Sequence, residues 1–227
     1  MPRQARVSVA DVVYHVINRA NGRQTIFHND KDYRHFETLL EEAVTLTGMR
    51  LHAYCIMPNH WHLVLFPSTD TTMSEFMSWL TLTHSRQYRT RTQTIGHGHL
   101  YQDRYKSFPV EDDKHCVDLV RYVEQNPLRA RLVERAEDWQ WGSLYRREKG
   151  SLQQKNLLAP LPTELPTNYL ESVNEIIRDD SLRDLRYSVN KGRPYGSDGW
   201  IAEMVDRFGL GHTTRGAGRP RKMVIKL

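Results

Sequence analysis

The sequence predicts an α+β fold, a ferredoxin-like antiparallel sheet with helices on one face, followed by a mainly helical C-terminal segment with a basic tail. The first observation is an order of strand, helix, strand, strand, helix and strand along the N-terminal half. The second is the hydrophobic period, which switches between two and 3.6 residues. The third is a proline-rich stretch, residues 150–167, which interrupts helix and strand. It predicts two regions, 1–150 and 151–227.

The first elements follow from local composition. Residues 12–17 are rich in β-branched side chains and predict a strand. Residues 30–47 carry apolar side chains at helical spacing, with Asn29 or Asp30 available to cap the start and Gly48 to end the helix.

A hairpin and a second helix are predicted next. Residues 51–57 alternate between apolar and polar positions, Pro58 and Asn59 interrupt the pattern, and residues 60–66 resume it. The sequence Thr72-Met73-Ser74-Glu75 has the spacing of a capping box, which predicts a helix from there to about Arg89.

The remaining elements complete the pattern. Residues 100–110 predict a fourth strand, and an apolar stripe from Cys116 to Val123 predicts a helix that Asn126-Pro127 ends or kinks. In the C-terminal region, residues 169–179, 181–189 and 197–208 predict helices.

Composition limits the class of protein. The chain has 227 residues with 32 basic and 27 acidic side chains, a net charge of +5, which permits a polyanionic partner. The longest apolar run, residues 53–57, is too short for a transmembrane helix, so we expect no membrane partner. Two cysteines, Cys55 and Cys116, exclude a disulfide scaffold, and no secretory signal is expected; a cytoplasmic location fits.

The sharpest local pattern is a pair of histidines in the predicted 60–66 strand. His60 and His62 are two residues apart, so their side chains point to the same face of the sheet, while Trp61 points to the other. Two imidazoles on one face can hold a divalent metal ion. The alternative is a pair of surface or hydrogen-bonded histidines, because two ligands do not complete a metal site.

A second pattern follows on the last helix of the N-terminal region. Tyr122 and Asn126 are four residues apart and therefore neighbours on one helix face. A tyrosine with a pKa near 10 is a poor nucleophile unless its electrophile is polarised by a metal ion. Without further context, a half-buried tyrosine and a helix-ending asparagine are the better explanation of the pair.

Basic residues suggest where a nucleic acid would bind. The candidates in the tail are Arg215, Arg219, Arg221 and Lys222, around a Gly-Arg-Pro sequence similar to the hooks that bind the DNA minor groove; those in the fourth strand are Arg104 and Lys106. A solvated terminus and an ordinary core strand are the alternative interpretations.

Together these pieces resemble a known family. The histidine pair and the later Tyr122–Asn126 helix look like the HUH endonucleases that use a single tyrosine, and more specifically like the REP-associated tyrosine transposases. The stretches that carry this likeness are residues 14–19, 57–62, 100–107, 122–130, 192–194, 196–200 and 218–222.

The resemblance implies a role for each residue at these positions. It makes His60, His62 and Asn126 ligands of Mg²⁺ or Mn²⁺, although the Asn126 amide could instead orient the tyrosine. It makes Tyr122 the nucleophile that cuts single-stranded DNA, leaving a 5′-phosphotyrosine link and a free 3′-hydroxyl. It also implies an HUH endonuclease core for the fold.

The expected function is therefore a metal-dependent, sequence-specific endonuclease and strand transferase that acts on repetitive extragenic palindrome (REP) hairpins. We expect single-stranded or hairpin DNA as partner, no nucleotide cofactor, a nucleoid-associated location, and a monomer rather than a dimer. Two alternatives stay open. The chain could be a catalytically inactive regulator that binds the hairpin, or a phosphohydrolase in which water attacks.

Overall fold

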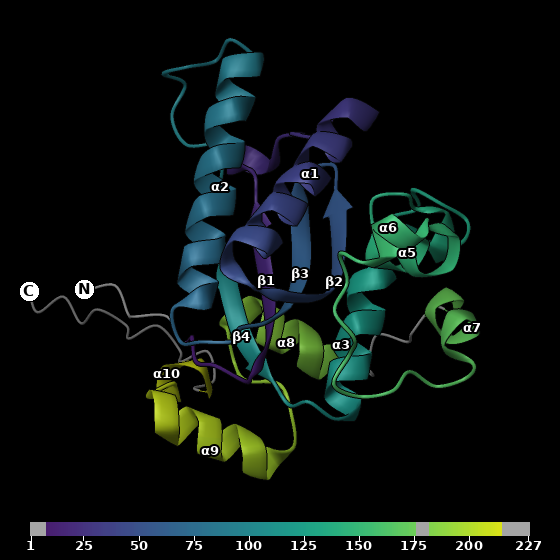
Figure 1. Cartoon of the computed structure of the whole chain (residues 1–227). Helices are drawn as coiled ribbons and strands as arrows, with labels where there is room; N and C mark the ends of the chain where they lie inside the picture. The colour runs from purple at the N-terminus through teal and green to yellow at the C-terminus, as the bar shows by residue number, and fades with distance from the viewer. Residues whose placement is uncertain (1–7, 176–181, 215–227) are drawn as a thin grey trace, which may run out of the picture.

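The structure is a computed structural model that describes residues 8–175 and 182–214. Its centre is a four-stranded sheet in the order β2-β3-β1-β4, in which every neighbouring pair is antiparallel. The predicted α+β class and ferredoxin-like order of elements are confirmed (Figure 1). The elements of this half are β1 (Val13–Arg19), α1 (Asp30–Thr47), β2 (Arg50–Met57), β3 (His60–Phe66), α2 (Thr72–Arg91), β4 (Lys106–Val110) and α3 (Lys114–Glu124).

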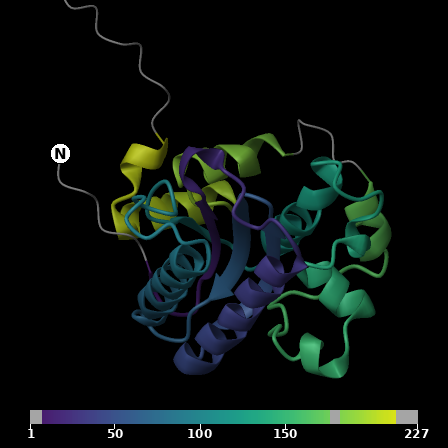
Figure 2. The same ribbon diagram turned by 90° about the horizontal axis from the view of Figure 1, so that it is seen from above.

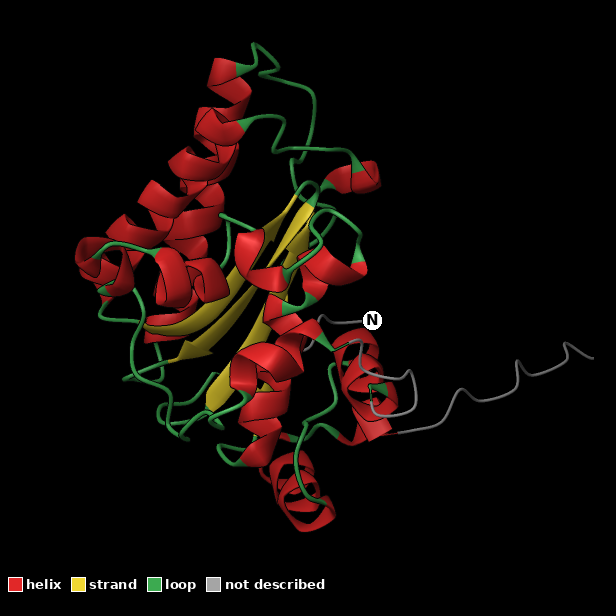
Figure 3. Ribbon diagram, turned by 90° about the vertical axis from the view of Figure 1, so that its right-hand side faces the viewer, coloured by secondary structure: helices red, strands yellow, loops and turns green. Residues whose placement is uncertain are grey.

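Helices cover both faces of the sheet, which corrects the expectation of helices on one face (Figure 3). Helices α1 and α2 pack on the face that presents Trp61 and Leu63. Helix α3 packs on the opposite face, against Val64 and Phe108. The reason is that β3 is apolar on both sides beyond His62, so both of its faces must be removed from water.

Local signals place α1, while two other predictions need correction. Asn29 accepts a hydrogen bond from the Lys31 amide, and Gly48 ends the helix with φ of 67°. The predicted capping box at Thr72 does not form; its hydroxyl oxygen accepts from the Thr69 amide instead. The predicted strand over residues 100–110 is shortened to β4, because Tyr101 turns its hydroxyl into the core on the α2 side.

The C-terminal segment is helical, as predicted, and packs against α3. Tyr169, Val173 and Leu185 belong to the same hydrophobic cluster as the buried face of α3, and the Gln125 amide donates to the Val173 carbonyl at 2.7 Å. Seen from above, α8 lies across the sheet from α1 and α2 (Figure 2). The division at residue 150 stays a prediction. The helices after α3 are α4 (Asn126–Arg129), α5 (Ser143–Lys149), α6 (Leu152–Lys155), α7 (Tyr169–Asn174), α8 (Arg183–Lys191), α9 (Asp198–Phe208) and α10 (Gly211–Thr214).

A buried histidine on α2 gives the fold a pH dependence. His84 is 1% exposed, its Nδ1 lies 2.6 Å from the Tyr101 hydroxyl, and burial lowers its pKa to about 3. Between pH 6.5 and 3, His84 is therefore protonated in the unfolded chain but not in the folded chain. The free energy of unfolding falls as the pH falls through this range. A buried histidine of this kind lowers the free energy of unfolding by about 1.4 kcal/mol for each pH unit within this range.

We expect the free energy of unfolding to depend less on pH in His84→Gln than in the parent. Between pH 7 and 4.5, urea unfolding should show that the variant loses about 2–3 kcal/mol less than the parent, whatever its stability at pH 7. Parallel pH profiles for the two proteins would contradict the assignment.

Candidate active site

His60 and His62 lie side by side on β3, on the face covered by α3. Their ring centroids are 5.1 Å apart. The Nδ1 atom of each ring already has a partner: the His60 Nδ1 lies 2.6 Å from Asn59 Oδ1, and the His62 Nδ1 lies 2.9 Å from Nε2 of His15. Among the described residues the two Nε2 atoms make no hydrogen bond, so these are the nitrogens left for an ion.

The electrostatic surroundings keep both rings neutral. Burial lowers the pKa of His60 to about 4, with the positive charge of Arg19 acting in the same direction. Burial also holds the pKa of His62 well below its usual range. Because a metal ion binds the neutral imidazole, the pair fits a divalent cation in both protonation state and free atoms.

Tyr122 projects from α3 toward the same face. Its ring centroid lies 5.9 Å from that of His62 and 6.4 Å from that of His15, and it is 9% exposed. Burial raises the pKa of Tyr122, while nearby arginines, among them Arg129, act in the opposite direction. The fold thus brings the predicted nucleophile beside the predicted metal ligands.

Asn126 sits one turn further along, at the junction of α3 and α4. Its Nδ2 donates to the carbonyls of Tyr122, at 2.9 Å, and Val123, at 3.2 Å. These bonds satisfy carbonyls at the end of α3, as expected of a helix-ending asparagine. They use the donor side of the amide, which leaves Oδ1 as the atom that could bind a metal ion.

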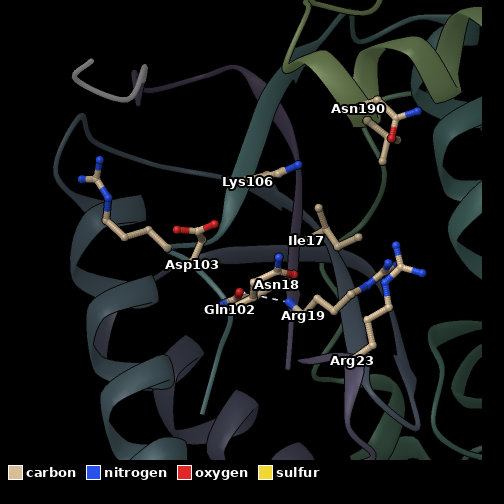
Figure 4. A pocket seen from close by; sticks show the side chains of 10 residues that line it. Ile17, Asn18, Arg19, Arg23, Gln102, Asp103, Lys106 and Asn190 are labelled. Atoms are coloured by element: carbon tan, nitrogen blue, oxygen red, sulfur yellow. Dashed lines mark hydrogen bonds between the residues drawn. The ribbon is translucent and has the colours of Figure 1, made fainter. Parts of the chain in front are cut away.

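A basic pocket of about 320 Å³ adjoins the histidine pair. Figure 4 shows Lys106, Arg19 and Arg23 among its lining residues. The two cations predicted in the fourth strand, Arg104 and Lys106, both line it, whereas the sequence analysis missed the two on the β1 side. Arg19 pairs in register with His60, so this side of the pocket lies next to the histidine pair. The tail candidates Arg215, Arg219, Arg221 and Lys222 lie outside the described residues.

His15, which was not predicted as a site residue, contacts both His62 and Tyr122. Strand periodicity places His15 on one face of β1 with residues 13, 17 and 19, but only the register with β3 brings this face beside His62. His15 is fully buried, and burial lowers its pKa to about 3.

A second group of ionisable side chains, Glu111, Asp113 and His115, gathers where β4 leads into α3. Their atoms already serve the fold. Asp113 caps α3 by accepting from the His115 amide at 2.8 Å, and Glu111 accepts from the Ser197 amide at 2.6 Å. This group was not predicted, and its hydrogen bonds give it a structural role at the starts of α3 and α9.

Comparison with known proteins adds to this picture. A relative from Haemophilus influenzae that is named as a REP-associated tyrosine transposase is 26% identical over 108 residues, which are 44% of this chain and 61% of that protein. The chain therefore spans less than two thirds of that relative's length. A solved structure described as a REP-associated tyrosine transposase bound to a REP hairpin superposes with a TM-score of 0.51 at 14% identity, covering 73% of this chain and 93% of that one. That likeness shows a shared fold.

In residues 8–175 and 182–214, none of the helices combines the length and apolarity needed to cross a bilayer. The model of the family described as "Transposase IS200 like" matches residues 8–126. This match covers more than half of the chain and includes the histidine pair, Tyr122 and Asn126. The chain therefore belongs to the IS200-like transposase family.

Proposed function

We propose that this protein is a metal-dependent endonuclease and strand transferase acting on single-stranded DNA beside REP hairpins. The observation that carries the proposal is the placement of His60, His62 and Tyr122 on one face of the sheet, with 5.9 Å between the His62 and Tyr122 ring centroids. The REP hairpin named for the structural neighbour supports this choice of substrate. Such a substrate would place the protein at the nucleoid.

The chain's own residues suggest how the reaction proceeds. Mg²⁺ or Mn²⁺, held by His60, His62 and Oδ1 of Asn126, would polarise the scissile phosphate and offset its developing charge, with imidazole favouring Mn²⁺. The Tyr122 hydroxyl attacks phosphorus and loses its proton to solvent. The bond from phosphorus to the 3′-oxygen breaks, and that oxygen takes up a proton.

The product is a 5′-phosphotyrosine link and a free 3′-hydroxyl. When a 3′-hydroxyl attacks that link, the phosphodiester forms again and the Tyr122 hydroxyl is restored. One phosphoester bond replaces another at each step, so the cycle needs no nucleotide cofactor.

The edges of the sheet support a monomer. On β2, the Ile56 amide donates to the Trp141 carbonyl at 2.9 Å, and the Tyr54 amide donates to Ser143 Oγ at 3.1 Å. On β4, the chain around Tyr195 forms a parallel bridge to Val110. Because the chain itself pairs with these outer strands, they offer few free groups for edge-to-edge pairing with a second copy.

The test is a covalent adduct. A labelled DNA hairpin with a single-stranded flank is incubated with the protein, with and without Mn²⁺, and then denatured. We expect a protein–DNA adduct only with the metal. Binding without nicking would favour the inactive regulator, and cleavage without an adduct would favour the phosphohydrolase.

A further inference from the structure

The basic pocket beside His60 contains more than positive charge. Its lining combines four cations and one carboxylate with three side-chain amides and two apolar side chains. The cations are Arg19, Arg23, Arg104 and Lys106, the carboxylate is Asp103, and two of the amides are those of Gln102 and Asn190. Its volume of about 320 Å³ lies within the range of small-ligand sites, roughly 300–1,000 Å³.

Hydrogen bonds tie this pocket to the histidine site. The Asn59 side chain donates to the Arg23 carbonyl at 3.0 Å through Nδ2, and its Oδ1 lies 2.6 Å from the His60 ring nitrogen. Ile17, which also lines the pocket, pairs in register with both His62 and Lys106. These contacts place the pocket next to the two histidines that are proposed to hold the metal ion.

The backbone of the pocket wall is held in an uncommon conformation. Arg23 has φ of 56°, in the left-handed region that costs a residue with a side chain about 1 kcal/mol or more. Its amide donates to the Ala20 carbonyl at 3.1 Å, and the Asn59 bond holds its carbonyl. A strained residue held from both sides and placed in a pocket favours a functional role for that segment.

The cations and the side-chain amides of the pocket can make different contacts with DNA. Cations bind phosphate whatever the sequence, whereas side-chain amides pair with the edges of bases and distinguish among them. Gln102 and Asn190 are both exposed, so their amides are available to a base. The backbone N–H of Gln102 donates to the Arg19 carbonyl at 2.9 Å, which holds this residue at the end of β1 and leaves its side-chain amide free of that bond.

We infer that this pocket binds one nucleotide of the single-stranded flank, with the four cations on its phosphates and the amides of Gln102 and Asn190 reading its base. The inference rests on the proposed function and deepens it, because it assigns part of the sequence specificity. Asn190 lies on α8, so the C-terminal segment contributes directly to base choice. Asp103 excludes a second phosphate from its side of the pocket by charge repulsion.

The experiment separates the two kinds of contact. Hairpins with a flank of randomised sequence are bound to the metal-free protein, and the retained flanks are sequenced. We expect the parent to prefer one base at one flank position. The double variant Gln102→Ala, Asn190→Ala should reduce that preference about tenfold while leaving the salt dependence of binding unchanged.

A charge variant, which removes two of the cations, should change the affinity and its salt dependence and leave the base preference unchanged. Arg23→Gln with Lys106→Gln should weaken binding to all flanks alike and reduce the slope of log affinity against log salt by about 1.4, or 0.7 for each lost phosphate contact. Arg34→Gln, which removes an exposed cation on α1, is the control and should change neither quantity.

Three outcomes would overturn the inference: a parent that prefers no base, an amide variant that keeps the parent's preference, or a charge variant that keeps the parent's salt slope. Failure of the proposed function shows up elsewhere, as a parent that forms no adduct with Mn²⁺. The binding assay needs no metal, so the two proposals can fail independently.

Discussion

Tyr122→Phe is expected to abolish the covalent protein–DNA adduct and to lower Mn²⁺-dependent cleavage by at least about a thousandfold, because the substitution removes the attacking oxygen itself. The ring should keep its packing against His62 and His15. In the described part of the chain the Tyr122 hydroxyl makes no hydrogen bond, so its loss leaves no buried partner unsatisfied. Hairpin affinity should therefore stay within about twofold of the parent.

The matched control is Tyr145→Phe, which removes a hydroxyl from a half-buried tyrosine on α5. This variant should form the adduct at the parental rate. The measurement is a denaturing gel of labelled hairpin after incubation with Mn²⁺. An adduct that persists in Tyr122→Phe would show that another residue is the nucleophile.

Arg147→Met is expected to destabilise the fold by about 3–5 kcal/mol, because it leaves a buried carboxylate without its counter-charge. That carboxylate belongs to Glu124, the last residue of α3, whose side chain is 0% exposed and pairs with Arg147. Two neutral hydroxyls would remain on Glu124, those of Ser143 at 2.5 Å and Tyr169 at 2.7 Å. The pair thus joins α3 to α5, and Tyr169 adds α7.

Urea unfolding of a double-mutant cycle measures this effect. Adding Glu124→Gln to Arg147→Met should recover part of the lost stability, since it removes the uncompensated charge. The control Arg34→Met breaks a pair with Asp30 whose two side chains are each 67% exposed, and should cost less than about 1 kcal/mol. A loss below 1 kcal/mol in Arg147→Met would contradict a role for the pair in holding α3.

Local patterns were sufficient where each element carries its own signal. The strand over residues 60–66 matches β3 at both ends, because the Pro58-Asn59 turn precedes it and Pro67 follows its apolar run. Helix α1 begins and ends as predicted, since a side-chain cap and a left-handed glycine lie at its ends. The capping box predicted at Thr72 was wrong, because its hydroxyl accepts from the amide of Thr69 in the preceding turn. The strand predicted over residues 100–105 was wrong as well, because the Tyr101 hydroxyl accepts from the distant Trp61 ring nitrogen.

The candidate site likewise contains residues that could be selected from the sequence and residues that could not. Spacing along β3 and α3, together with the resemblance to the family, was enough to select His60, His62, Tyr122 and Asn126, whose chemical roles stay predictions. Local spacing could not select His15, Arg19 or Arg23. Residues on β1, or in the turn that follows it, become neighbours of the histidine pair only when antiparallel pairing sets the register.

The amino-acid sequence alone was enough for the order of strands and helices, because that order depends on hydrophobic periodicity and turn residues. With the family resemblance it also selected the candidate site residues, whose chemical roles stay predictions. Three-dimensional packing decided the rest. It placed α3 over the second face of the sheet, buried Glu124 against Arg147, and added Asn190 of α8 to the pocket. Each of these contacts joins residues far apart in the chain. Burial of apolar surface brings them together, and because this driving force is not directional, no short stretch of sequence indicates which residues will meet.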